Sequence, residues 1–434
     1  MMRAADMNMK LIPAMILMAL AGTAGASGFQ LQNQTGSGNG NAFAGAAAAA
    51  EDAGTVFFNP AGMTMLPRGH SISLSGTLLN RSINYTDKGS VQNSAPAPLT
   101  TGNGGNAGGL ALLPAGFWAY GISQNLSVGV GVSPTFGNTT EYDFDFTGRS
   151  AGYYFSMEQI NINPSIAYKV NETVSLGGGI NFAQNKSHFK QGVPLGALAG
   201  LPANNYLDVK GEDWATGYNL GAMFQVSPVT RIGLAYRSRL DFELVGKQEY
   251  GTPVAGLLVN QDVKAKLTTP SNVSLAVSHK LSDKWEMLGD MTWTGWSVVN
   301  QLYVNNKDTG APLVNLSYNF KDTWRVGLGA NYQYSDTWKL RFGVAYDKSP
   351  VKSNQDRTMT LPDSDRTWLS FGAKYFLSKA ASLDIGYTHI LFADAQTNRA
   401  VNTGYPGVLT LRQTINGDIK TSVDILSVQY NHSF

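Results

Sequence analysis

Residues 420–434 read KTSVDILSVQYNHSF, and this C-terminal stretch alternates apolar and polar side chains. A β-strand points successive side chains to opposite faces, so the stretch has one apolar and one polar face. The apolar face carries Leu426, Val428, Tyr430 and Phe434, and His432 is its one interruption. Such a strand has to cover its apolar face with a second protein layer or with lipid.

The same alternation recurs in fourteen segments between His70 and Phe434. The predicted strands are 70–85, 110–122, 126–135, 158–170, 173–190, 213–227, 229–245, 271–281, 284–299, 321–334, 337–348, 366–378, 381–392 and 420–434. Six short turns and seven long loops alternate strictly between these strands. No helix-period segment covers the apolar faces, which leaves a very large sandwich or a closed barrel in lipid. The regular sorting of the connections favours an all-β, fourteen-stranded antiparallel transmembrane barrel with both termini in the periplasm.

The alternation also assigns faces. In 321–334, Trp324, Val326 and Leu328 should face lipid, and Arg325 should face the lumen. In 337–348, Lys339, Arg341 and Asp347 should point inward, where charged residues often only pair with each other.

The first residues predict export. Arg3 and Lys10 precede an apolar run from Leu11 to Leu20, and Ala24-Gly25-Ala26 supplies a small-residue cleavage pattern. We therefore expect a signal peptide at 1–26; the alternative, an N-terminal membrane anchor, conflicts with the shortness of the run. Repeated alternation in an exported chain predicts the bacterial outer membrane.

Composition agrees with a barrel and excludes several function classes. Aromatic residues reach 11% and charged residues only 14%, and the mean hydropathy is −0.14. The 32 basic and 30 acidic residues nearly balance, which gives no basis for nucleic-acid binding. There is no cysteine, so neither disulfides nor thiolate metal sites hold the fold. No serine elbow or carboxylate pair beside a histidine stands out, so we expect neither an enzyme nor a cofactor or metal site.

Residues 27–69, here the N-terminal segment, lose the alternation. They hold Gly36, Gly38, Gly40, an alanine run at 46–50 and several large apolar side chains. A fourteen-stranded lumen has to be filled or it conducts water, so this segment is predicted to be an internal plug ahead of a barrel at 70–434. The alternative is a disordered periplasmic leader, and a passive porin would have no plug.

Several motifs resemble FadL-type outer-membrane transporters of long-chain fatty acids and other hydrophobic compounds. They are the start Ser27–Leu31, Glu51–Gly54, Asn59-Pro60-Ala61, Met157–Asn171, Thr294–Ser297, Phe320–Arg325, Asp347–Pro350 and Pro362–Arg366. The resemblance implies a plugged fourteen-stranded barrel. It also implies a ligand route from a groove between the third and fourth external loops, through a pocket inside the barrel, to a sideways exit at a kink in the third strand.

Residues of this chain can be assigned to that route. The apolar loop positions Leu195, Leu198 and Leu201, and Val254, Leu257 and Leu258, should contact ligand, since exposed apolar patches usually bind something; the alternative is that the two loops only cap each other. The resemblance adds Phe29 to the pocket. In the third strand, Gly129, Gly131 and Pro134 predict a break in pairing and a lateral opening, or simply a bulge near the rim.

The resemblance further implies that Lys186 and Lys321 bind the carboxylate of the ligand, although either could be part of a structural ion pair. Lysine at 186 offers a point charge where the family pattern leads us to expect the fork of arginine. Asn59, Asp347 and Arg366, with Pro60 and Ala61 of the Asn59 motif, are expected to hold the plug to the wall. The rival substrate is an aromatic hydrocarbon such as toluene, which has no carboxylate for a lysine to bind. The other expected partners are outer-membrane lipid and lipopolysaccharide, and we expect a monomer.

Overall fold

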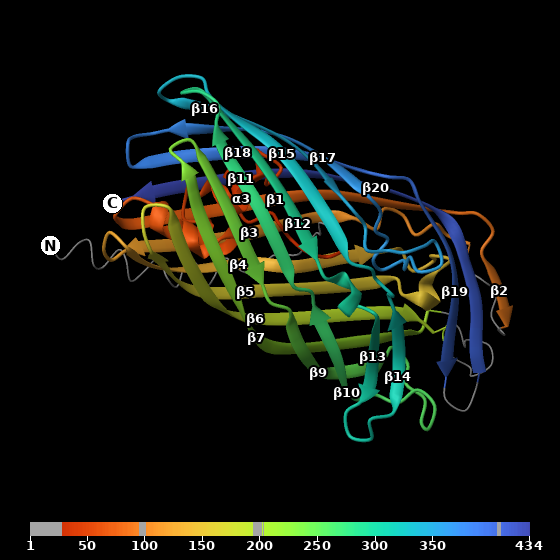
Figure 1. Ribbon diagram of the computed structural model, residues 1–434. Coiled ribbons are helices and arrows are strands. Elements are labelled where there is room, and N and C mark those ends of the chain that lie inside the picture. Colours follow the sequence, from red (N-terminus) through yellow and green to blue (C-terminus); the bar gives the residue numbers. More distant parts are fainter. Residues whose placement is uncertain (1–27, 95–100, 194–201, 203, 406–408) are drawn as a thin grey trace.

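The computed structural model describes residues 28–94, 101–193, 202, 204–405 and 409–434. Its strands form one antiparallel sheet that closes on itself, because β1 (Gly69–Asp87) pairs with both β3 (Gly109–Gly121) and β20 (Leu409–Ser433) (Figure 1). The predicted fourteen-stranded antiparallel barrel is therefore confirmed. The other strands of the ring are β4 (Leu126–Glu141), β5 (Tyr154–Lys169), β6 (Val174–Gly192), β7 (Tyr206–Ser227), β8 (Thr230–Arg237), β11 (Asn272–Lys280), β12 (Trp285–Thr294), β15 (Thr323–Gln333), β16 (Trp338–Asp347), β17 (Arg366–Phe376) and β18 (Ala381–Phe392).

The long connections contain strands of their own, which the sequence did not predict. These are β2 (Val91–Ser94), β9 (Leu240–Tyr250), β10 (Gln261–Thr269), β13 (Gln301–Asn306), β14 (Pro312–Ser317) and β19 (Ala395–Tyr405). They extend the sheet beyond one end of the ring (Figure 1), and the predicted strand 229–245 is divided between β8 and β9 at Ser238-Arg239. Such extensions are hard to predict because strands beyond the membrane no longer need an apolar outer face, so β19 reads AQTNRAVNTGY.

The predicted faces of the ring strands are confirmed. Trp324, Val326 and Leu328 are exposed on the outer wall, and Arg325 between them is buried. Outward aromatic rings pair across strands near the end with the short turns, as Trp285 does with Tyr332 at 4.6 Å between ring centroids. Rings at this level are typical of the membrane interface. No helix in the described ranges is long and apolar enough to cross a membrane.

The described part of the N-terminal segment lies inside the ring (Figure 1). It forms short helical turns: α2 (Gly36–Asn39), α3 (Ala46–Ala49), α4 (Thr55–Phe58) and the 3-10 turn η1 (Pro60–Met65). Two further 3-10 turns, η2 (Arg149–Ala151) and η3 (Trp296–Val298), lie in loops. Thr35 caps α2 by accepting the Gly38 N–H, and Asn59 caps η1 by accepting the Ala61 N–H.

Small residues on both sides allow this segment to pack closely against the wall. A methyl group added to Gly343 on β16 would lie 2.1 Å from the carbonyl carbon of Asn41, and one added to Gly233 on β8 would lie 1.9 Å from the Ala47 carbonyl oxygen. Both distances are far inside van der Waals contact, so only glycine fits at these positions. Side-chain amides of the segment complete the contact, since Asn39 Nδ2 donates to the Gly386 carbonyl at 2.9 Å.

Candidate substrate-binding site

An apolar cavity of about 660 Å³, counting its space open to solvent, lies at the end of the barrel that carries the long loops. At one edge is Phe29, which is 1% exposed and packs edge-on against Trp296 at 4.8 Å between ring centroids. The rest of the lining comes mainly from strands β5 to β14: Phe155, Met157, Ser187, His188, Phe189, Val209, Lys210, Gly211, Leu244, Val263, Ala265, Leu267, Val299, Leu302, Val304, Leu316, Tyr318 and Leu361.

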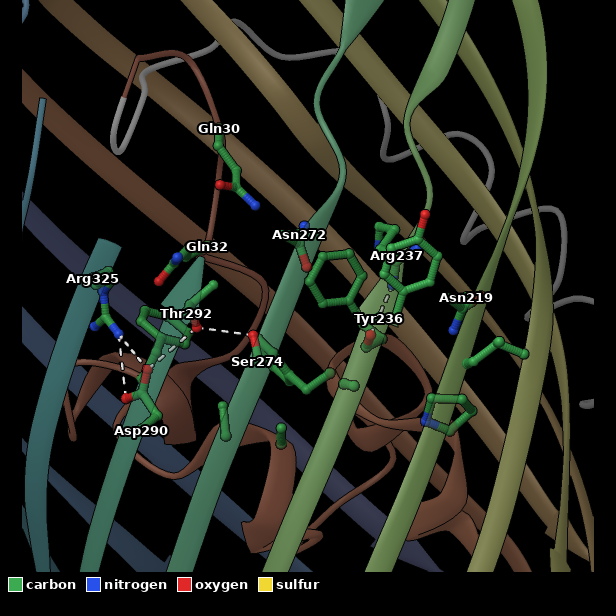
Figure 2. Close-up of a pocket in the computed structure, with 18 of the residues that line it drawn as sticks. Gln30, Gln32, Asn219, Tyr236, Arg237, Asn272, Ser274, Asp290, Thr292 and Arg325 are labelled. Carbon is green, nitrogen blue, oxygen red and sulfur yellow. Dashed lines mark hydrogen bonds and ion pairs between the residues drawn. The ribbon is translucent and has the colours of Figure 1, made fainter. Parts of the chain in front are cut away.

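A second cavity, of about 670 Å³, lies between the N-terminal segment and the wall (Figure 2). Its lining is rich in amides and hydroxyls: Gln30, Gln32, Asn219, Asn272, Ser274, Thr292 and Tyr236, with the charged Arg237, Asp290 and Arg325. Its apolar lining comes mostly from the segment, through Leu31, Phe43, Ala46, Ala47, Phe57, Phe58 and Pro60, with Leu220 and Ala235 on the wall. Phe29 borders the apolar cavity and Gln30 the polar one, so the chain near residues 29–32 separates two chemically different spaces.

The ladder between β3 and β4 is interrupted. It ends at the pair Gly116–Val132, beyond which β3 stays paired with β1 and β4 stays paired with β5 as far as Glu141. The β4–β5 register shifts between Pro134 and Phe136, so β4 carries a bulge there. The edge of β4 that β3 leaves free pairs with the N-terminal segment: the Leu31 N–H donates to Thr135 O at 2.9 Å, and the Gly137 N–H donates to Phe29 O at 2.8 Å.

The two glycines of β4 face tightly packed neighbours. A methyl group at Gly129 would lie 2.7 Å from Met63 Sδ of the N-terminal segment, and one at Gly131 would lie 2.8 Å from the ring of Phe117 on β3. These glycines therefore make room for the segment and for Phe117 beside the gap. Pro134 presents its carbonyl to the Gln34 side chain at 2.7 Å.

Comparison with known proteins assigns the architecture. Residues 17–434 match the family model described as outer membrane protein transport protein (OMPP1/FadL/TodX). The chain belongs to this family. It is 31% identical to a putative outer membrane protein of Neisseria meningitidis over 89% of this chain and 90% of that one, and 29% identical to the long-chain fatty acid transport protein of Escherichia coli K12 over 86% and 90%. A FadL homologue of Pseudomonas aeruginosa shares the fold, with a TM-score of 0.83 at 24% identity over 94% of this chain and 100% of that one.

Membership in the FadL family makes this chain a bacterial outer-membrane protein that transports hydrophobic compounds, and not an enzyme. The outer-membrane location, the transport of hydrophobic compounds and the expectation of no enzyme activity are thereby confirmed.

The structure corrects the placement of Lys186. Its side chain lies on the outer face of β6, the face that carries Ile180 and Phe182, and is 52% exposed beside Glu212 at 3.8 Å. A lysine on the lipid side of the wall is not a lumen residue, so the implied contact with ligand inside the barrel is wrong. Lys321 is also exposed, and its backbone N–H donates to Pro350 O at 2.9 Å. Within the described residues, neither lysine lines either cavity.

The apolar residues of the fourth external loop pack into the protein. Leu258 is fully buried, and Val254 and Leu257 pack against the hydrophobic cluster that surrounds the apolar cavity. The Leu258 N–H donates to Val254 O at 2.8 Å, which closes this loop on itself. Leu195, Leu198 and Leu201 lie outside the described residues.

The predicted anchoring residues fall into two groups. Arg366 and Asp347 lie together, at 3.6 Å, and Arg366 Nη2 contacts Asp363 Oδ1 at 2.6 Å. Asp363 in turn accepts the Gly28 N–H at 3.1 Å, which ties the start of the segment to the connection between β16 and β17. Burial raises the pKa of the Asp363 carboxyl. The charge of Arg366 and the hydrogen bonds from the Gly28 N–H and the Ser349 hydroxyl oppose that effect.

Asn59 is not part of that cluster. Its Nδ2 donates to Ala47 O at 2.8 Å and to Ala222 O on β7 at 3.0 Å. It therefore links two turns of the segment to a different part of the ring. Pro60 and Ala61 are buried beside it, where a methyl group on Gly177 of β6 would lie 2.4 Å from the Ala61 nitrogen.

The largest anchor, centred on Glu51, was missed by the sequence analysis. Arg341 Nη2 lies 2.7 Å from Glu51 Oε2 and 2.8 Å from Asp384 Oδ1, and Lys339 and Lys374 approach the Glu51 carboxylate to 3.7 and 3.6 Å. Burial alone would raise the pKa of Glu51, but the three cations hold it well below its ordinary value of 4.5. The segment therefore presents a charged carboxylate to the wall.

Proposed function

We propose that the protein takes up long-chain fatty acids across the outer membrane. The observation that carries the proposal is the apolar cavity, lined by aliphatic and aromatic side chains and bordered by Phe29. Such a lining gains about 0.8 kcal/mol for every methylene that it removes from water, so long acyl chains should bind better than short ones. A relative 29% identical is named a long-chain fatty acid transport protein, which supports the same substrate class.

The competing substrate is an aromatic hydrocarbon. One feature of the apolar cavity favours it. The two basic lining residues, His188 and Lys210, lie on the outer-face register of β6 and β7, where they contact Asp208 at 2.9 and 3.6 Å. They are therefore already paired, and a ligand without a carboxylate does not need them. Titration of the purified protein with oleate, octanoate and toluene separates the two substrates. Affinity should rise steeply from octanoate to oleate; if toluene bound as tightly as oleate, the hydrocarbon reading would replace ours.

We propose that the N-terminal segment plugs the lumen. Support comes from its burial within the ring and from the glycines that admit its backbone to the wall. A plugged barrel should pass few ions when reconstituted in a planar bilayer. Protease added from the periplasmic side should leave the chain near Asn59 intact, and rapid cleavage there would indicate a free leader.

We propose that ligand leaves sideways through the gap between β3 and β4. The gap is supported by the ladder that ends at Gly116–Val132 and by the bulge beside Pro134. Because a side chain at Gly131 would collide with Phe117, Pro134→Val is the cleaner variant for testing this route. Uptake should slow while binding persists.

We also propose that the protein is a monomer whose outer face contacts lipopolysaccharide. The support for lipopolysaccharide is the group of charged residues on the outer face near the long loops, including Lys186, Lys190 and Lys210. Native mass spectrometry of the protein purified with its lipids tests both points. A dimer, or retained lipopolysaccharide that is unaffected by Lys190→Glu, would contradict them.

A further inference from the structure

The polar cavity contains an arginine without an acidic partner. Arg237 Nη1 donates to Asn181 Oδ1, Nη2 donates to Phe57 O at 2.8 Å, and the guanidinium lies 4.4 Å above the Phe57 ring. Both acceptors are neutral, and no carboxylate of a described residue forms an ion pair with this guanidinium. By contrast, Arg325, Arg341 and Arg366 each contact a carboxylate within 3.0 Å.

A second donor lies directly beside it. Asn219 on β7 is the cross-strand partner of Arg237 on β8, and both side chains line the polar cavity (Figure 2). Asn219 is 2% exposed, and its Oδ1 accepts from Asn163 Nδ2 at 2.8 Å. The Asn219 side-chain nitrogen Nδ2 is not used in that bond, and it has no hydrogen-bond partner in the part of the chain that is described. Polar donors buried without a partner are costly.

The other lining residues do not neutralise the charge of Arg237. Asp290 is the one acidic residue among the lining residues, and Arg325 Nη1 holds it at 3.0 Å (Figure 2). Gln30, Asn272 and Ser274 are uncharged, and Phe57 and Phe58 supply an apolar surface next to the guanidinium. The cavity therefore offers one uncompensated positive charge, a neighbouring N–H donor and an apolar wall.

We propose that Arg237 and Asn219 bind the carboxylate head of the transported acid. The inference rests on the proposed fatty acid uptake and names the residues that select for the acid. A guanidinium presents two parallel N–H groups that match the two oxygens of a carboxylate, and Asn219 adds a third donor. The methylenes next to the head contact Phe57 and Phe58. The head group is thus recognised beside the N-terminal segment, beyond Phe29 as seen from the apolar cavity.

The test compares an acid with its alcohol. Oleate and oleyl alcohol share the same chain, so a residue that binds the carboxylate should affect only oleate. We expect Arg237→Gln in the full-length protein to weaken oleate binding roughly tenfold to a hundredfold and to leave oleyl alcohol unchanged. Arg231→Gln is the matched control: Arg231 also points inward from β8 and donates to the N-terminal segment, at Ala49 O and 2.8 Å, but it does not line the polar cavity.

A second variant guards against loss of folding. Asn219→Asp keeps the size of the side chain and supplies Arg237 with the missing carboxylate, so it should weaken oleate and spare the alcohol even if Arg237→Gln fails to assemble. Heat-modifiable migration in gels reports whether each barrel has folded.

The outcomes separate the inference from the function on which it rests. If the wild-type protein bound neither compound, the proposed function and the inference would both fail. If it bound oleate, and the variants weakened both compounds equally, weakened neither, or matched Arg231→Gln, then only the carboxylate site would be refuted.

Discussion

Replacing Glu51 by glutamine should loosen the N-terminal segment from the barrel wall. The Glu51 carboxylate contacts Arg341 at 2.7 Å and lies within 3.7 Å of Lys339 and Lys374. Glutamine keeps the shape and one acceptor oxygen but removes the charge that these three cations share. The variant therefore isolates the electrostatic part of the anchor.

The free-energy cost of the substitution depends on the ion pairs that Arg341 keeps. Breaking a buried ion pair costs about 3–5 kcal/mol, because it leaves an uncompensated charge. Here Arg341 keeps Asp384 at 2.8 Å, so the lower end, about 3 kcal/mol, applies. A cost of that size raises the population of displaced segments roughly a hundredfold, since each 1.4 kcal/mol is about a factor of ten. Single-channel recording in planar bilayers should show it as more frequent ion-conducting openings.

Asp52→Asn is the matched control for this experiment. Asp52 is the next residue and also acidic, but its carboxylate accepts from Ser37 Oγ at 2.7 Å and from the Gly54 N–H at 2.8 Å, both inside the segment. Its loss should disturb the anchor to the wall far less. If Glu51→Gln opened no more often than Asp52→Asn, the argument that charge pairing to Arg341 holds the segment would be refuted.

Three further outcomes are expected. Gly343→Ala should displace the segment and raise conductance, because its methyl group would lie 2.1 Å from the carbonyl carbon of Asn41; Gly289→Ala, with its nearest neighbour at 3.4 Å, should behave as wild type in the same recordings. Pro134→Val should slow oleate uptake by cells while leaving binding to the purified protein intact, and an unchanged uptake rate would count against the lateral route. The third outcome concerns pH. A carboxyl whose pKa is lower in the folded than in the unfolded protein stabilises the folded state at pH values above its unfolded pKa, and this stabilisation is lost as the pH falls through its folded pKa. Because the pKa of Glu51 lies well below 4.5, conductance should stay flat between pH 7 and 5 and rise only in stronger acid.

The ring strands could be predicted from sequence because alternation is a local signal. The exposed Trp324 and buried Arg325 follow from period two alone. The same parity would have placed Lys186 correctly, since Ile180 and Phe182 on its strand are outward and both are an even number of residues away. At this position the family likeness implies an inward lysine, whereas the alternation implies an outward one. For a single charged residue on a barrel strand, parity is the stronger constraint.

The Glu51 anchor could not be predicted in the same way because it joins distant parts of the chain. Parity places Arg341 inside the lumen, but its partner Glu51 is 290 residues away and lies in a segment without alternation. Nothing local indicates which lumen cation receives it. A weak signal was available: Glu51 is one of only two acidic residues in an otherwise glycine- and alanine-rich stretch, and a charge at such a position needs a partner once it is buried.

Arg341 and Arg237 differ in their partners, and the consequence of this difference can be tested. Arg341 contacts two carboxylates, so an acidic ligand could reach it only by displacing one of them and loosening the N-terminal segment. Arg237 binds neutral oxygens, which a carboxylate can replace at lower cost. The two sites share no side chain and contact the N-terminal segment at different residues, Phe57 and Glu51, so ligand binding and anchoring should be nearly independent. In a double-mutant cycle, the effect of Arg237→Gln on oleate affinity should be the same in wild type and in Glu51→Gln to within about 0.5 kcal/mol. A larger coupling energy would show that the head-group site and the anchor act as one network.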